Sequence, residues 1–154
     1  MNSYPTPRVI RPARPDEQKV LEQLQWRASL VHDEYRDQLL AHPEAVVLPL
    51  EHILQGHVLV AEFEEQIAGF AVVLPGEAGM AELDGLFVEP SLHGQGVGRQ
   101  LTEAGATLAR SQGSRRLLVV AGPAGAPFYQ RLGFTTVRQQ DTRFGPAVLM
   151  ERAI

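Results

Sequence analysis

A short glycine-rich stretch, between an extended segment and a helix-forming one, has the clearest chemical use in this sequence. It reads His93-Gly94-Gln95-Gly96-Val97-Gly98 and is followed by Arg99. The first turn of a helix leaves backbone N–H groups unpaired and carries a partial positive charge. Because glycines let the backbone come close to a bulky anion, the stretch favours a phosphate or pyrophosphate at this helix start. Arg99 would add a mobile positive charge there.

Two well-known nucleotide-binding motifs do not match this stretch. A P-loop requires Gly-Lys-Ser/Thr, whereas the sequence has Gly98-Arg99-Gln100. A dinucleotide-binding turn has a third glycine where Leu101 stands, and it follows an early strand. Taken alone, the glycine turn is equally compatible with a plain loop.

Three side chains outside the turn have the chemistry for proton transfer. Glu82 and Asp84 alternate with apolar residues in the extended segment 81–88, so both carboxylates are expected on one face of a strand. A carboxylate in a site can accept a proton from an amine, whose unperturbed pKa is about 10. Tyr129 can donate a proton. The alternative interpretations are solvated or substrate-positioning carboxylates, and a core tyrosine packed beside Phe128.

The elements that must position these residues follow from hydrophobic periodicity and from Gly and Pro breaks. We expect one α/β domain over residues 1–154 with a mixed sheet. Strands are expected at 8–11, 57–63, 66–74, 81–88, 116–121, 134–140 and 147–152. Helices are expected at 16–31, 33–41 and 126–132, and from the glycine cluster to about 112. The segment 45–55 is ambiguous, and 50–55 could form one short helix.

Several details of these elements are specific enough to test. Asp16 is expected to cap the first helix, whose apolar stripe would hold Val20, Leu21, Leu24, Ala28 and Val31. The long helix after the glycines should bury Val97, Leu101, Ala104 and Leu108. The apolar run 116–121 should be covered on both faces.

Composition narrows the class of protein. The 154 residues include 44% hydrophobic residues, enough for a sizeable core, and a net charge of −4 argues against nucleic acid as a partner. Without cysteine there is no disulfide and no cysteine nucleophile. The five histidines show no metal-ligand spacing. Neither a signal peptide nor an apolar run of about 20 residues is apparent, so we expect a cytoplasmic protein with no metal and no membrane contact.

Two motifs in the chain resemble those of the GCN5-related N-acetyltransferase (GNAT) superfamily. Residues 93–98 resemble its acyl-CoA-binding motif, Q/R-x-x-G-x-G/A, with His93 at the first position. The segment 128–134, FYQRLGF, resembles its F-Y-x-x-x-G-F turn, and Gly122 stands where the family often has Asn. The resemblance extends from Arg8 nearly to the C-terminus. It implies a mixed, mostly antiparallel central sheet of about seven strands, flanked by helices.

The resemblance also implies roles for individual residues. The pantetheine arm of acetyl-CoA would pair with Leu86, Phe87 and Val88, and a backbone N–H near Phe87 would hold the thioester oxygen. Glu82 matches the general base of the histone-acetylating branch, Asp84 is the next candidate, and Tyr129 matches the usual general acid. The pyrophosphate would lie on the backbone of His93, Gly94, Gln95, Gly96, Val97, Gly98 and Arg99.

The acceptor is expected at 26–53 and 141–146, where members of the family vary most. Trp26 lies off the helix stripe and would face a cleft or pack between helices; Arg27 is a second candidate, and Arg143 would bind a carboxylate or be a plain loop arginine. The favoured function is transfer of an acetyl group from acetyl-CoA to a small amine or an amino-acid-like molecule. A protein lysine or N-terminal acetyltransferase and a non-catalytic acyl-CoA-binding module are the alternatives. The family allows a homodimer.

Overall fold

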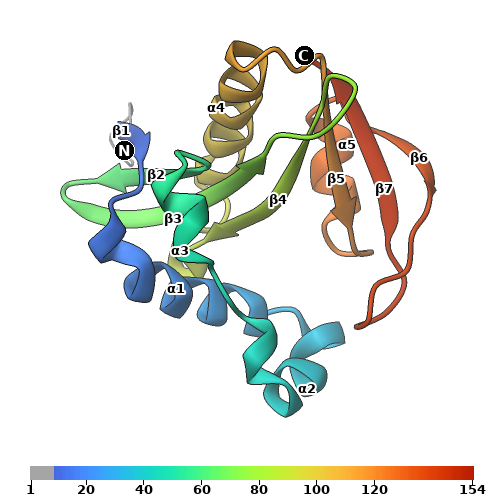
Figure 1. Ribbon diagram of the computed structural model, residues 1–154. Coiled ribbons are helices and arrows are strands. Elements are labelled where there is room, and N and C mark those ends of the chain that lie inside the picture. Colours follow the sequence, from blue (N-terminus) through green and yellow to red (C-terminus); the bar gives the residue numbers. More distant parts are fainter. Residues whose placement is uncertain (1–8) are drawn as a thin grey trace.

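A single seven-stranded sheet organises the computed structural model, which describes residues 9–154 except the side chains of 33–35 (Figure 1). The strands lie in the order β1-β2-β3-β4-β5-β7-β6, and every neighbouring pair is antiparallel except β4 and β5. This confirms the expected mixed, mostly antiparallel sheet. The strands are β1 (Val9–Pro12), β2 (Val58–Phe63), β3 (Gln66–Leu74), β4 (Met80–Val88), β5 (Arg116–Ala121), β6 (Thr135–Gln139) and β7 (Val148–Ala153).

Helices cover both faces of the sheet. One face carries α4 (Val97–Ser111) and α5 (Ala126–Arg131), and the other carries α1 (Gln18–Leu30) and α3 (Leu50–Leu54), with α2 (Asp33–Ala41) packed beside α1. Short 3₁₀ turns precede or join these helices at Pro15–Glu17, Pro43–Ala45 and Pro90–Leu92. Since each sheet face has its own helices, the molecule has two hydrophobic cores.

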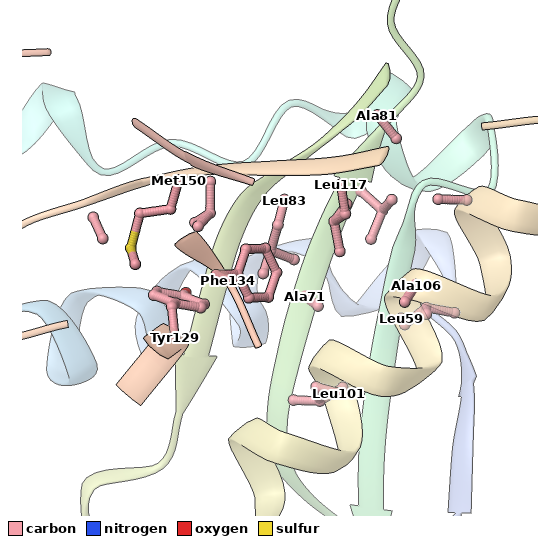
Figure 2. Close-up of a cluster of buried hydrophobic side chains, with 14 of the residues drawn as sticks. Leu59, Ala71, Ala81, Leu83, Leu101, Ala106, Leu117, Tyr129, Phe134 and Met150 are labelled. Carbon is pink, nitrogen blue, oxygen red and sulfur yellow. The ribbon is translucent and has the colours of Figure 1, made fainter. Parts of the chain in front are cut away.

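The larger core lies between the sheet and the helices α4 and α5 (Figure 2). Leu101 and Ala106 of α4 meet Leu59, Ala71 and Leu83 of the sheet, while Tyr129 of α5 lies beside Phe134 and Met150. The helix is further tied to β7, because Arg152 donates two hydrogen bonds of 2.8 Å to the Glu103 carboxylate. The start of α4 is therefore held at a fixed place against the sheet.

The smaller core joins α1 to the opposite face. Leu21, Leu24 and Ala28 of α1 pack with Phe70 and Val72 of β3. The Phe87 ring joins this core from β4, with its centroid 5.1 Å from that of Phe70.

Three sequence-based expectations about these elements are wrong. Val20 and Val31 are 47% and 45% exposed, because they flank the narrow stripe by which α1 meets the sheet. Asp16 does not cap α1; it lies in a 3₁₀ turn, and the Glu17 carboxylate accepts the backbone N–H of Arg14 at 2.7 Å instead. The expected cover on both faces of β5 is also absent, since alternate residues of the strand are only half-buried.

The expected stripe of α4 is partly confirmed. Val97 and Leu101 are fully buried, whereas Ala104 and Leu108 are half-buried at its border. Gly105, Ala106 and Ala109 are buried instead. These small residues let α4 approach the sheet closely: a Cβ built on Gly105 would lie 3.0 Å from Val73.

Candidate active site

Strands β4 and β5 separate part-way along the sheet. They pair in parallel only from Met80 opposite Arg116 to Glu82 opposite Leu118. Beyond that point β4 continues to Val88 beside β3, while β5 stays with β7 and the two strands diverge (Figure 1). One edge of β4 from Leu83 to Val88 therefore has no strand partner.

The register of β4 shows which of its backbone groups face this gap. The backbone N–H of Glu89 donates to the Ala68 oxygen at 2.8 Å, and Phe87 stands opposite Phe70 two positions earlier. In an antiparallel pair, residues that exchange hydrogen bonds alternate with residues that do not. Phe87 is therefore bonded to β3, and the N–H and C=O groups of Leu86 and Val88 point into the gap. The N–H group expected to hold the thioester oxygen near Phe87 would be that of Leu86 or that of Val88.

Side chains on this part of β4 divide between the two faces of the sheet. Leu86 and Val88 pack with the core of α4 and α5, whereas Phe87 packs with the core of α1. At its unpaired edge, β4 therefore contributes side chains to both cores.

The glycine turn lies on the α4 side of the gap. Gly94 and Gly96 have φ angles of 81° and 83°, left-handed values that favour glycine, and a Cβ added at either would meet nothing within 4 Å. Among the described residues, the backbone N–H groups of Gly94 and of 96–99 donate to no backbone oxygen. The side chains of His93 and Arg99 are exposed beside them. Free donors and the positive end of a fifteen-residue helix make this turn suited to a diphosphate.

The second motif packs directly against the first. A Cβ built on Gly98 would lie 3.2 Å from Cζ of Phe128 and 3.7 Å from Cγ2 of Val88. A larger residue at 98 would require the Phe128 ring to move by a few tenths of an ångström, so the glycine favours close packing of α4 against this ring. The two sequence motifs therefore form one structural unit.

Tyr129 is held by aromatic rings. It is 9% exposed and lies edge-on to Phe128 and Phe134, with ring centroids 5.0 and 5.4 Å away. Its hydroxyl has no hydrogen-bond partner within the part of the chain that the structure describes. Burial raises the pKa of the Tyr129 phenol, so the hydroxyl stays protonated and is available as a donor.

Glu82 and Asp84 lie on β4 near the point where the strands part. Ala81 and Leu83 are buried in the α4 core, so Glu82 between them leaves on the α1 face. The β3–β4 register slips between Val72 and Val73, which leaves Asp84 as an extra residue in β4. Desolvation raises the pKa of the Glu82 carboxyl although its side chain reaches solvent, and the nearby charge of Asp84 raises it further. The shared face expected for the two carboxylates stays a prediction.

A pocket of about 340 Å³ opens on the α1 side of the gap. It brings together the two segments from which an acceptor site was expected, 26–53 and 141–146, with Phe87 of β4 and Val120 of β5 at its base. Neither Glu82 nor Asp84 lines it. The lining residues are Ser29, His32, Leu39, Phe87, Val120, Gly122, Thr142, Phe144 and Ala147.

The three residues proposed for the acceptor do not line this pocket. Trp26 and Arg27 both line a separate groove of about 610 Å³ between α1 and residues 43–46. Arg27 donates to both oxygens of Glu89, at 3.0 and 2.8 Å. Arg143 lies 3.5 Å from the Glu44 carboxylate, with its guanidinium 4.8 Å from the centre of the Phe144 ring. Their contact with an acceptor stays a prediction.

Sequence reasoning did not single out Val120, Ser29, Leu39 or Ala147 as site residues. Val120 stands in a continuous apolar run, and no local signal separates it from core residues. Its role depends on the divergence of β4 and β5, which is a property of pairing between distant segments.

The described residues contain neither a metal-binding group nor a membrane-spanning helix. No group of three or more His, Cys, Asp or Glu residues there has the arrangement of a metal site. Within the same residues, no helix has the length and hydrophobicity needed to cross a membrane.

Comparison with known proteins identifies a family whose model matches this chain. A family model described as the acetyltransferase (GNAT) domain matches residues 55–136, more than half of the chain. No curated protein matches the sequence. The fold resembles that of PaiA N-acetyltransferase from Thermoplasma acidophilum, solved in complex with coenzyme A, with a TM-score of 0.78 and 18% identity over 97% of this chain and 100% of that one.

Two further solved structures resemble the chain. The structure of yncA from Salmonella typhimurium with acetyl-CoA gives a TM-score of 0.69 and 21% identity, over 96% of this chain and 94% of that one. N-acetylglutamate synthase from Neisseria gonorrhoeae was solved in complex with coenzyme A and N-acetyl-glutamate. It gives a TM-score of 0.72 and 21% identity, over 99% of this chain and 36% of that one. At these identities the likeness concerns the fold.

Proposed function

The chain belongs to the GNAT family and is an acetyl-CoA-dependent acetyltransferase, and we propose that it transfers the acetyl group directly to the amine of a small molecule. The gap between β4 and β5 is the observation that carries this proposal. Helix-start amides with no backbone acceptor among the described residues lie on one side of the sheet, and an open pocket lies on the other. A thioester entering from the α4 side would meet an amine only within this gap.

The residues around the gap supply what acyl transfer needs. The amine nitrogen forms a bond to the thioester carbon while the carbon–sulfur bond breaks and its electron pair goes to sulfur. The backbone N–H of Leu86 or Val88 donates to the carbonyl oxygen as it gains charge. Glu82 takes the proton that leaves the amine, directly or through water, and the Tyr129 hydroxyl donates to the departing sulfur. No covalent cysteine intermediate is involved, since the chain has no cysteine.

The proposal is tested by a thiol-release assay with acetyl-CoA and a panel of small amines, amino acids and peptides, followed by mass spectrometry of the products. We expect release that depends on a small amine and yields its acetamide. Binding of acetyl-CoA without release for any acceptor would identify a non-catalytic module instead. Release that occurs only with peptides would identify a protein-directed enzyme.

Two finer features belong to this proposal. We place the enzyme in the cytoplasm, because a cysteine-free chain gains nothing from an oxidising compartment. We also propose a homodimer, supported by β6, a strand at the sheet edge with all five residues exposed. Light scattering on the purified protein tests the dimer, and a monomer at all concentrations would contradict it.

A further inference from the structure

The chemistry of the pocket on the α1 side restricts its ligand. We propose that the acceptor is a primary monoamine with a small, uncharged and apolar body, and that the pocket rejects a second ammonium group. This inference rests on the proposed function and concerns the acceptor part of the same site.

Most of the lining residues are apolar. Phe87 and Phe144 supply aromatic rings, and Leu39, Val120 and Ala147 supply aliphatic groups. Among the side chains that the structure describes, which exclude those of 33–35, no carboxylate and no cation of Lys or Arg lines the pocket, and His32 is the one ionisable lining residue.

The polar groups of the pocket offer little to a charged ligand. The Thr142 hydroxyl already donates to the Gly145 oxygen at 3.2 Å and accepts the N–H of Phe144 at 3.2 Å. The Ser29 hydroxyl and the His32 ring remain, and neither carries a negative charge that could neutralise an ammonium.

Two carboxylates near the lining residues in the chain are already paired with arginines. Glu44 is paired with Arg143, and Glu89 is paired with Arg27 through two hydrogen bonds. Glu82 and Asp84 precede Phe87 on β4 and do not line the pocket. Among the described side chains, the lining therefore offers a second ammonium group no carboxylate in exchange for its lost water, which is strongly unfavourable.

The size of the pocket limits the acceptor body. Pockets for small molecules span about 300–1,000 Å³, and this one, at about 340 Å³, is near the lower limit. It suits a short alkyl or single-ring body.

The test compares amines that differ by one charge. Pentylamine, 1,5-diaminopentane, 5-aminopentanoate and 2-phenylethylamine are assayed with acetyl-CoA at one pH and ionic strength. We expect kcat/KM for pentylamine and 2-phenylethylamine to exceed that for the diamine and the amino acid at least tenfold.

Two variants place a carboxylate in the lining, Ser29→Asp on α1 and Val120→Asp on β5. Both should narrow or reverse the preference for pentylamine over the diamine. Val137→Asp on exposed β6 makes the same kind of change away from the pocket and should leave the ratio unchanged. Two variants on different elements keep the test decisive if one of them does not fold.

The outcomes separate this inference from the proposed function. Equal or better turnover of the diamine by the unmodified protein would overturn the inference and leave the small-amine acetyltransferase in place. No release with any amine would overturn both.

Discussion

Tyr129 combines a buried ring with a hydroxyl that has no partner among the described residues. Burial raises the pKa of its phenol far above the value of about 8.5 for a free thiol. Complete proton transfer from this phenol to a thiolate would be uphill, but a hydrogen bond to the developing negative charge on sulfur is favourable in such an environment. The structure thus favours a donor that stabilises the leaving group and stays protonated.

Replacing Tyr129 with Phe tests this role. The change removes one hydroxyl and no hydrogen bond, so the thermal midpoint should stay close to that of the wild type. We expect kcat to fall about 10²-fold, as is typical when one such donor is lost, with little change in acetyl-CoA affinity. Single-turnover kinetics and calorimetry measure the two quantities. A variant with full activity would show that Tyr129 is a core residue only.

The pair Glu82 and Asp84 predicts a particular pH dependence. In the proposed mechanism the Glu82 carboxylate is the base, so the acid limb of kcat/KM is expected to follow its pKa, which burial and then the charge of Asp84 raise. Asp84→Asn removes that charge, lowers the pKa of Glu82 and should move the acid limb to lower pH. Glu82→Gln should lower kcat and abolish this limb. Identical pH–rate curves for the wild type and both variants would exclude the two residues from the mechanism.

Glu82 has a corresponding effect on stability. A carboxyl whose folded pKa lies above its unfolded value contributes stability at low pH, and this contribution is lost as the pH rises through the folded pKa. At neutral pH the charged Glu82 is therefore unfavourable for folding. Glu82→Gln should leave the thermal midpoint at neutral pH unchanged or higher, which separates loss of function from loss of fold.

At the scale of elements, the two ends of α4 offer a matched pair of glycines. Gly96 before the helix and Gly113 after it have φ angles of 83° and 92°, and a Cβ at either would meet nothing within 4 Å. Alanine in this left-handed region costs roughly 1–2 kcal/mol at both positions. Both variants should lose similar stability, but only Gly96→Ala should weaken acetyl-CoA binding, because only that backbone presents the free donors. Equal affinities by calorimetry would place the diphosphate elsewhere.

A contact between α1 and the end of β4 also bears on the cofactor side. Glu89 precedes the 3₁₀ turn Pro90–Leu92 that leads into the glycine turn, and the two hydrogen bonds from Arg27 balance its charge. These bonds raise the pKa of Arg27, so the guanidinium remains charged throughout the working range. Without it, the bare carboxylate of Glu89 would repel a diphosphate bound at the glycine turn, and salt would weaken this repulsion.

Arg27→Met should therefore raise the Kd for acetyl-CoA several-fold, more at low than at high ionic strength. The double variant with Glu89→Gln should recover most of that affinity, since both charges are then gone. Calorimetry at two salt concentrations measures the effect. If the double variant binds no better than Arg27→Met, the pair acts only by fixing α1, or Arg27 contacts the acceptor as first expected from the sequence.

Individual elements show which features of the structure can be predicted from the sequence. The glycine turn, the hairpin at Glu64-Glu65 and the alternation of Glu82 and Asp84 depend on neighbouring residues, and all three are found in the structure. The bond from Arg14 to Glu17 in place of a cap by Asp16, and the exposure of Val20, depend on how α1 and the turn before it meet the sheet, which no local pattern records. Val120 lines the pocket because β4 turns away from β5, so its role was invisible in the run 116–121.

At the scale of the molecule, the proposed mechanism places the two reactants on opposite faces of the sheet and brings them together at the gap between β4 and β5. Both motifs lie on the face of α4 and α5, and the pocket proposed for the acceptor lies on the face of α1. The face of α4 and α5 presents backbone donors at regular spacing, and this arrangement requires glycines that form a recognisable sequence motif. The face of α1 is built from apolar side chains of several distant elements, and such a surface has no short motif. This explains why the sequence predicts the cofactor well and the acceptor poorly.

The whole molecule should respond to acetyl-CoA as one cooperative unit, because the ligand would touch β4, α4 and α5, which share one core. A ligand at 100 times its Kd stabilises the folded state by about 2.7 kcal/mol. For a domain of this size 1 kcal/mol shifts the thermal midpoint by about 2–4 °C, so a rise of roughly 5–10 °C is expected. Gly96→Ala should reduce this rise at equal ligand concentration and Gly113→Ala should not. No rise and no binding heat at saturating acetyl-CoA would mean that the amides at the start of α4 do not bind a diphosphate.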